Sequence, residues 1–389
     1  AVNFGATGSA SWVTTVKTGD FTAVAGEGYF VDTTSQEIDV ALPAGVAGAV
    51  VAIKDYAGTF DTNNCILVQN GSDKIGGSTV NATLDTEGIA VTLVFIDSTQ
   101  GWLVTDSGLQ SEVPQPYSVD FLVVAGGGAG GSTYIGAGGG AGGYRTSTQL
   151  VSTSTAITIT VGDGGTAPYS SPGTIGGDGT NSSISGSGLT TITSTGGGGG
   201  GSYLTGGNPG RSGGSGGGGS HSFSGGAGNT PSTSPSQGNN GGTGTSAPGE
   251  PSGGGGGAGA VGGNFSGTTA GSGGNGLASS ITGGSVTYAG GGGGSAYGPS
   301  GGVAGAGGTG GGGAGSVGAG ANGTVNLGGG GGGSDRSGGT YAGGSGGKGV
   351  VILSMPSANF SGTTTGSPTE ATSGGNKILT FTGDGSYTA

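Results

Sequence analysis

The chain of 389 residues contains one histidine, His221, and one cysteine, Cys65. A zinc site needs about four such ligands, and a thiol nucleophile needs a basic partner beside it. Cys65 opens the apolar run 65–68, which is typical of a buried strand. His221 lies in a Gly/Ser tract without the G-x-S-x-G turn of a serine hydrolase. We therefore expect no catalytic residues, no metal site and no enzyme activity.

The acidic residues stand mostly as single residues in turns, which does not favour acid–base catalysis. Glu37 and Asp39 alternate along one expected strand, and we interpret them as a solvated sheet face. The sequence leaves open whether calcium binds at 61–64 or at Asp73, although no loop has the EF-hand spacing. No Gly-Lys-Ser/Thr follows a glycine block, so the many Gly-x-Gly-x-x-Gly matches are chance and no cofactor is expected.

Glycine dominates the composition, with 110 residues, while only 7% of residues are charged. Collagen would need a strict Gly-X-Y period rich in proline, but here the glycines run in blocks and there are 13 prolines. Hydrophobic residues make up 30% and cluster, which does not fit a disordered chain. The net charge is −12, with the acidic residues concentrated in residues 1–113. This balance argues against nucleic-acid partners.

Residues 1–108 read as an all-β, sandwich-like domain with no helical periodicity. Val/Ile/Phe-rich runs alternate with Gly, Asn, Asp and Thr turns, as expected for short strands. The runs expected as strands are 28–32, 38–42, 49–53, 66–69, 89–96 and 102–104, the last two forming a hairpin. Residues 109–116 contain two prolines and no apolar run, and are interpreted as a linker.

Residues 117–356 form the glycine-rich part, bracketed by short strands at 117–125 and 349–354. Within it, 179–184 has a counterpart in 276–281, and each copy leads through a Thr-containing run into a glycine block. Residues 357–389 are expected to add a C-terminal β segment, as an extra strand or an exposed edge. The whole chain is thus expected to have essentially no α-helix.

Ordering a glycine block costs much backbone entropy, so folded blocks need a compensating interaction. A bundle of polyglycine II helices supplies it, because each three-residue turn points its N–H and C=O groups at neighbouring helices. Blocks such as 196–201, 253–257 and 328–333 are long enough for about two turns each. A flexible Gly/Ser linker is the alternative, but such a linker does not require bracketing strands.

Loops at the ends of such a bundle are free to vary and are where binding would reside. Segments 229–240 and 243–252 read as loops of this kind. The candidate ligand-binding residues are the aromatic rings beside the glycine blocks: Tyr203, His221, Phe223, Phe265, Tyr297 and Tyr341. These rings can stack on sugars, or they can cap and wedge the glycine helices; the sequence leaves both readings open.

The runs 121–128 and 138–145, together with the closing run 346–352, resemble the glycine-rich domain of bacteriophage tail-fibre proteins. The resemblance covers roughly two thirds of the chain. Residues 1–108 resemble a β module of marine and cyanophage virion proteins, through 28–33 and 91–97. The resemblance implies a virion-borne fibre or receptor-binding adhesin, often a homotrimer.

The function expected on these grounds is recognition of the host cell surface. Residues 1–108 would contact other virion proteins, and the glycine-rich loops would contact a host glycan or outer-membrane protein. No secretory signal opens the sequence, so we expect synthesis in the host cytoplasm and release on the virion by lysis. A purely architectural virion component is the alternative. An ice-binding protein is less favoured, because the glycine blocks lack a regular period.

Overall fold

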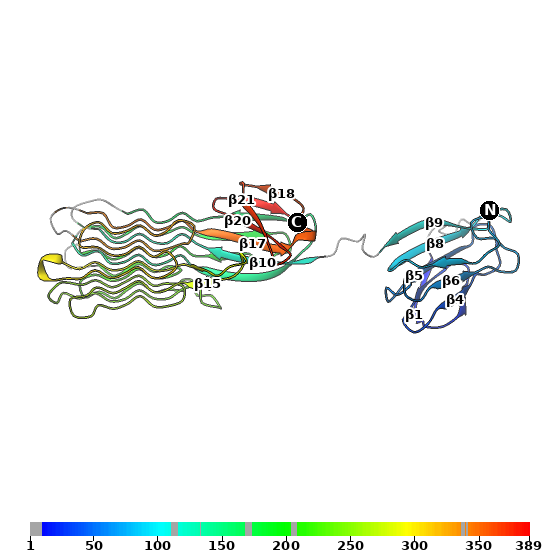
Figure 1. Cartoon of the computed structure of the whole chain (residues 1–389), viewed down its shortest axis with the longest axis horizontal. Helices are drawn as coiled ribbons and strands as arrows, with labels where there is room; N and C mark the ends of the chain where they lie inside the picture. The colour runs from blue at the N-terminus through cyan, green and yellow to red at the C-terminus, as the bar shows by residue number, and fades with distance from the viewer. Residues whose placement is uncertain are drawn as a thin grey trace, which may run out of the picture. The chain divides into compact units, whose positions relative to one another are not determined.

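The computed structural model describes residues 10–109, 116–132, 134–167, 173–203, 208–335, 339 and 341–389. The chain forms two compact units, Ala1–Gln115 and Pro116–Ala389 (Figure 1). Among the described residues the regular structure is β-strand, apart from the short 3-10 turns η2 (Gly298–Ser300) and η3 (Ser357–Asn359). The expected all-β class without α-helix is therefore confirmed. Most of the expected linker, residues 110–115, lies outside the described residues.

Two sheets pack face to face in the first unit. One has the order β1-β3-β5-β8-β9 and the other β2-β4-β6-β7. The strands are β1 (Ser11–Lys17), β2 (Phe21–Thr22), β3 (Glu27–Val31), β4 (Ile38–Ala41), β5 (Val50–Asp55), β6 (Cys65–Val68), β7 (Ala82–Leu84), β8 (Ile89–Phe95) and β9 (Trp102–Leu109). Side chains from both sheets share one core, including Ile53, Leu67 and the fully buried Trp102.

The strand directions differ from those of an ordinary antiparallel sandwich. β1, β3 and β5 are parallel neighbours in one sheet, and β2, β4 and β6 are parallel neighbours in the other. The chain therefore winds in coils, each contributing one strand to each sheet, as in a short β-solenoid. The antiparallel pair β8–β9 ends this winding and confirms the expected hairpin, with β9 extending beyond the predicted run to Leu109.

The second unit begins as an antiparallel β-sandwich. Its sheets have the orders β11-β10-β17-β20-β19 and β14-β13-β12-β21-β18, and β15 pairs with β16. The strands are β10 (Tyr117–Val124), β11 (Tyr144–Val151), β12 (Ala156–Thr160), β13 (Ser182–Gly186), β14 (Ile192–Ser194), β15 (Leu277–Ser279), β16 (Val286–Tyr288), β17 (Val350–Pro356), β18 (Thr363–Thr365), β19 (Thr369–Ser373), β20 (Asn376–Phe381) and β21 (Gly385–Thr388). The expected bracketing strands, β10 and β17, are direct neighbours.

The C-terminal residues are built into both of these sheets. β20 lies between β17 and β19, and β21 lies between β12 and β18. Phe381 and Tyr387, both fully buried, enter the core between the sheets. The Tyr387 hydroxyl lies 2.9 Å from that of Tyr117, and burial first, then this hydrogen bond, raise the pKa of Tyr117. Residues 357–389 are thus a structural part of the second unit rather than an appended segment.

The glycine segments continue from the sandwich strands and run back and forth between its end and a distal end (Figure 1). Residues 138–143 show how they are bonded. Successive amides donate to three different neighbouring segments, and amides three residues apart donate to the same segment. Gly138 and Ala141 donate to the carbonyls of Gly253 and Gly256, and Gly139 and Gly142 donate to those of Gly331 and Gly328. Gly140 and Gly143 donate to the carbonyls of Gly198 and Thr195. A side-chain core is not needed where every amide has a main-chain partner.

The carbonyl groups of the same stretch are used with the same period. They accept from the amides of three further segments. Gly140 and Ala137 accept from Gly128 and Gly131, and Ala141 and Gly138 accept from Ser215 and Gly218. Gly139 and Gly136 accept from Gly292 and Ser295. The stretch is therefore hydrogen-bonded to six other segments. We call the stretch and these six segments together the glycine lattice. The glycine positions of this stretch have no room for a Cβ atom; one at Gly139 would overlap the carbonyl oxygen of Gly128.

A layer of buried serines terminates the lattice at its distal end. The Ser295 hydroxyl lies 2.8 Å from the Gly136 carbonyl oxygen, and that of Ser252 lies 2.9 Å from the same atom. The Ser334 hydroxyl donates to the Tyr341 carbonyl, and that of Ser202 to the Ser132 carbonyl. All of these serines are fully buried. The hydroxyls satisfy carbonyls at the level where the glycine blocks end.

The two sequence repeats form equivalent structures. The first copy contains the antiparallel pair β13–β14 and leads into the block 196–201. The second contains the antiparallel pair β15–β16 and leads into the block 290–294. The predicted recurring unit, short strands followed by a glycine block, is confirmed.

Candidate functional site

The aromatic residues predicted from sequence lie at the distal end of the glycine lattice. Tyr203 and His221 directly follow the buried serines Ser202 and Ser220. Phe223 comes three residues after Ser220, and Tyr297 comes two residues after Ser295. The other two predicted residues are placed there by hydrogen bonds: the Tyr341 carbonyl accepts from the Ser334 hydroxyl, and the Phe265 amide donates to the Thr243 carbonyl. The lattice thus gathers side chains from separate turns at one end, which we call the distal tip.

Three of the rings at the tip are in contact. The ring centroids of Tyr203 and His221 are 4.5 Å apart, and those of Tyr134 and Tyr203 are 6.2 Å apart. The Tyr203 amide also donates to the Tyr134 carbonyl. Phe223 is 39% exposed. The tip therefore presents tilted aromatic faces, which suit stacking against a sugar ring or an apolar side chain.

Two of the tip turns contain non-glycine residues with left-handed backbone. Tyr134 and Ile135 have φ of 58° and 68°, and His221 and Ser222 have φ of 44° and 67°. Left-handed backbone is costly for non-glycine residues and most of all for a β-branched one such as Ile135. A chain with 110 glycines nevertheless places side chains at these positions. Such strain is typical of functional sites.

The predicted loops lie at opposite ends of the lattice. Loop 229–240 is at the sandwich end, where the Gln237 carbonyl accepts from the Tyr144 amide at the start of β11. Loop 243–252 spans the distal end, where the Gly249 carbonyl accepts from the Tyr297 amide. Only the second loop can therefore contribute to the tip.

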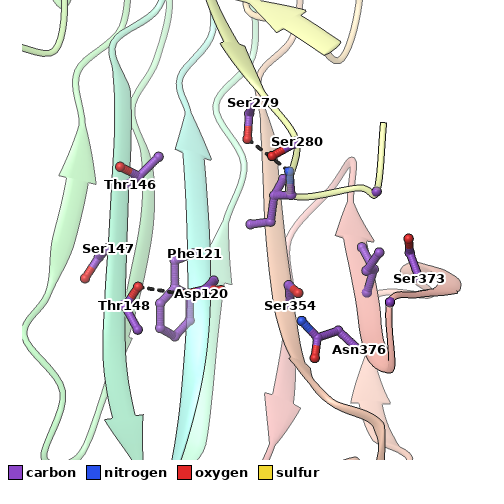
Figure 2. Close-up of a pocket in the computed structure, with 14 residues that line it drawn as sticks. Asp120, Phe121, Thr146, Ser147, Thr148, Ser279, Ser280, Ser354, Ser373 and Asn376 are labelled. Carbon is purple, nitrogen blue, oxygen red and sulfur yellow. Dashed lines mark hydrogen bonds between the residues drawn. The ribbon is translucent and has the colours of Figure 1, made fainter. Parts of the chain in front are cut away.

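A second concave surface, which sequence reasoning missed, lies on the outer face of the sheet β11-β10-β17-β20-β19. We call it the sheet groove; its volume is about 700 Å³. The antiparallel registers align Thr148, Asp120 and Ser354 in one row, on the face opposite the sandwich core. The Thr148 hydroxyl donates to Asp120 Oδ1 at 2.6 Å (Figure 2).

The sheet groove begins where the apolar cover of this sheet face ends. Closer to the lattice, the same face carries Leu122 and Ile352, which are buried against Tyr288 and Ala289, and Ile378 at the edge of the groove belongs to the same buried cluster. Beyond that cover, the turn after β15 and the turn between β19 and β20 form the walls, with Ser280 and Ser373 (Figure 2). The groove lining comes from six strands and two turns, so no local sequence pattern could predict it.

The groups considered for catalysis lie apart. Cys65 is fully buried in the first unit, and burial first, then Asp55 and Asp39, raise the pKa of its thiol to about 12. A thiol held neutral in this way is a poor nucleophile. His221 belongs to the second unit and its ring neighbour is Tyr203. Within the described part of the chain, no group of three His, Cys, Asp or Glu could hold a metal ion.

A family model described as a glycine-rich domain matches residues 105–356. This match spans more than half of the chain, and the protein belongs to the glycine-rich domain family. No curated protein matches the chain. The helices found in the described ranges are all too short to cross a membrane.

Proposed function

We propose that this chain is a virion fibre protein that recognises the host cell surface through its distal tip. The observation that carries the proposal is the convergence of Tyr134, Tyr203 and His221 from separate turns onto one end of the glycine lattice. Partly exposed aromatic residues on the turns of a rigid scaffold, two of them with strained backbone, suit a recognition surface. The resemblance to the glycine-rich domain of phage tail fibres supports the virion setting.

The lattice fits this role because it holds short turns without a large side-chain core. Residues three apart in a segment are hydrogen-bonded to the same neighbouring segment, and this period of three favours polyglycine II helices. Turns held by such helices can change in sequence without disturbing the main-chain bonds beneath them. A host glycan or an outer-membrane protein is the partner that we propose for the tip.

The first unit would attach the fibre to other virion proteins, as a homotrimer. Its outer sheet face carries Trp12, which is 44% exposed and whose ring lies 4.9 Å from that of Phe30. An exposed tryptophan of this kind is frequent in protein interfaces. Mass measurement of the full chain in solution tests the oligomeric state, and a monomer would contradict this part of the proposal.

Loss of the tip rings is expected to weaken binding to host cells. With Tyr203→Ala and His221→Ala together, we expect binding of the purified full chain to fall about tenfold or more, since buried aromatic contacts dominate interfaces. The measurement is the fraction of labelled protein that sediments with host cells. Tyr56→Ala is the matched control, because Tyr56 is 59% exposed in the first unit.

Two outcomes decide between the fibre adhesin and the architectural alternative. Selective loss with the tip variant, at unchanged thermal stability, supports the adhesin. If wild type and tip variant sediment with host cells equally, the tip rings do not recognise the host and serve to cap the lattice. If wild type does not sediment at all, the chain is an architectural component.

A further inference from the structure

The sheet groove contains several polar groups that make no hydrogen bond within the fold. Hydrogen bonds among the described residues leave the hydroxyls of Ser280, Ser354 and Ser373 and the side-chain amide of Asn376 without a partner in the protein. Asp120 Oδ1 accepts from Thr148, while Oδ2 has no such donor. Each hydroxyl can both donate and accept, and the amide adds two donors and an acceptor.

The electrostatics of the sheet groove exclude several ligand classes. Asp120 is its one charged side chain among the described lining residues. Phosphate, sulfate and carboxylate groups would therefore meet a carboxylate without a compensating cation. A metal ion would find one carboxylate, too few ligands for a specific site. A neutral ligand with many hydroxyl groups matches the lining best.

The shape of the sheet groove also restricts its ligand. Its volume of about 700 Å³ is that of a small-molecule site of ordinary size. One wall depends on a glycine: a Cβ at Gly283, where φ is +88°, would collide with the hydroxyl of Ser373. The two wall turns can approach only because position 283 has no side chain. The partly exposed Ile281 flanks one side and suits the C–H face of a sugar ring.

We propose that the sheet groove binds a short segment of a neutral oligosaccharide. Asp120 accepts hydrogen bonds from two neighbouring sugar hydroxyls, held in place by Thr148. Ser354 and Asn376 bond to the adjacent hydroxyls from the next strands of the sheet. No aromatic ring stacks on the ligand, so the affinity is low for a single segment and increases when several fibres bind one surface. This site lies on a different surface from the distal tip and does not depend on the function proposed for the tip.

Titration of the full chain with neutral tetrasaccharides tests the proposal. The probes are cellotetraose, maltotetraose and chitotetraose, each raised to about 10 mM and followed by ligand-observed NMR. We expect at least one of them to bind, and Asp120→Ala and Ser354→Ala each to weaken its binding about tenfold, as for a lost hydrogen bond to a charged or desolvated group. Thermal unfolding of each variant shows that the fold is retained.

Two controls separate the sheet groove from its surroundings and from the tip. Ser118→Ala changes a hydroxyl on the same face of β10, outside the groove, and should leave binding unchanged. Tyr203→Ala should weaken cell binding but leave tetrasaccharide binding unchanged. Absence of binding by all three probes, equal binding by the Asp120 and Ser354 variants, or loss of binding with Tyr203→Ala would each overturn the proposal. Failure of cell binding alone would contradict only the function proposed for the tip.

Discussion

Alanine at position 255 is expected to prevent the glycine lattice from forming. A Cβ on Gly255 would overlap the carbonyl group of Gly139, and the contacting atoms are main chain, which cannot rotate away. The Gly255 amide also donates to Gly292, and its carbonyl accepts from Gly274, so the segment is fixed on several sides. We expect Gly255→Ala to lower the free energy of unfolding of the second unit by about 3 kcal/mol or more.

The matched control for this substitution is Gly284→Ala. A Cβ at Gly284, in the turn between β15 and β16, meets nothing within 4 Å. Its effect on the free energy of unfolding should stay within about 0.5 kcal/mol. Denaturant unfolding can follow the two units separately, because both tryptophans, Trp12 and Trp102, belong to the first unit. Equal stability of the Gly255 and Gly284 variants would show that close approach of main chains does not stabilise this unit.

The second large effect is expected at Phe381, in the C-terminal strand β20. Phe381 is fully buried between the two sheets of the second unit, beside Phe121 and Leu353. Phe381→Ala leaves a cavity there, and such substitutions cost about 3–5 kcal/mol. Because β20 is an inner strand of its sheet, the loss should weaken the sandwich from which the glycine segments extend.

Phe223→Ala makes the same chemical change at the distal tip, where the side chain is 39% exposed. Its effect on stability should be within about 0.5 kcal/mol. The measurement is the denaturation midpoint of the second unit, read from near-ultraviolet circular dichroism of its tyrosines. A Phe381→Ala protein as stable as Phe223→Ala would mean that the C-terminal strands are dispensable for the fold.

Much of this fold could be predicted from local signals. Alternating apolar residues, as at Ile157, Ile159 and Val161, identify strands because successive side chains point to opposite faces. The placement of aromatic rings at block ends, as at Tyr203, gave the candidate ligand-binding residues, and the structure places those residues at one end of the lattice. The serine that follows several of the blocks, as in Ser202 and Ser334, is a local signal for the serine layer.

Features that depend on long-range pairing could not be predicted in the same way. The parallel winding of the first unit depends on which strands become neighbours, and strand sequences alone do not specify this. The sheet groove combines Asp120 with Ser354 and Asn376, which are more than two hundred residues further along the chain. Only the registers of β10, β17 and β20 bring these side chains onto one face of the sheet, with Asp120 beside Ser354 and Asn376 one pair further along β17.

Hydrogen exchange of the glycine amides tests most directly whether bonded main chains hold the second unit together. The amides of Gly139, Gly255, Gly292 and Gly330 all donate to carbonyls of other segments. We expect them to exchange on the order of a thousandfold more slowly than in an unstructured peptide, as amides of a cooperative core do. Exchange at the unstructured rate, while the sandwich strand amides stay protected, would show that no lattice exists and that the glycine segments form a flexible tether.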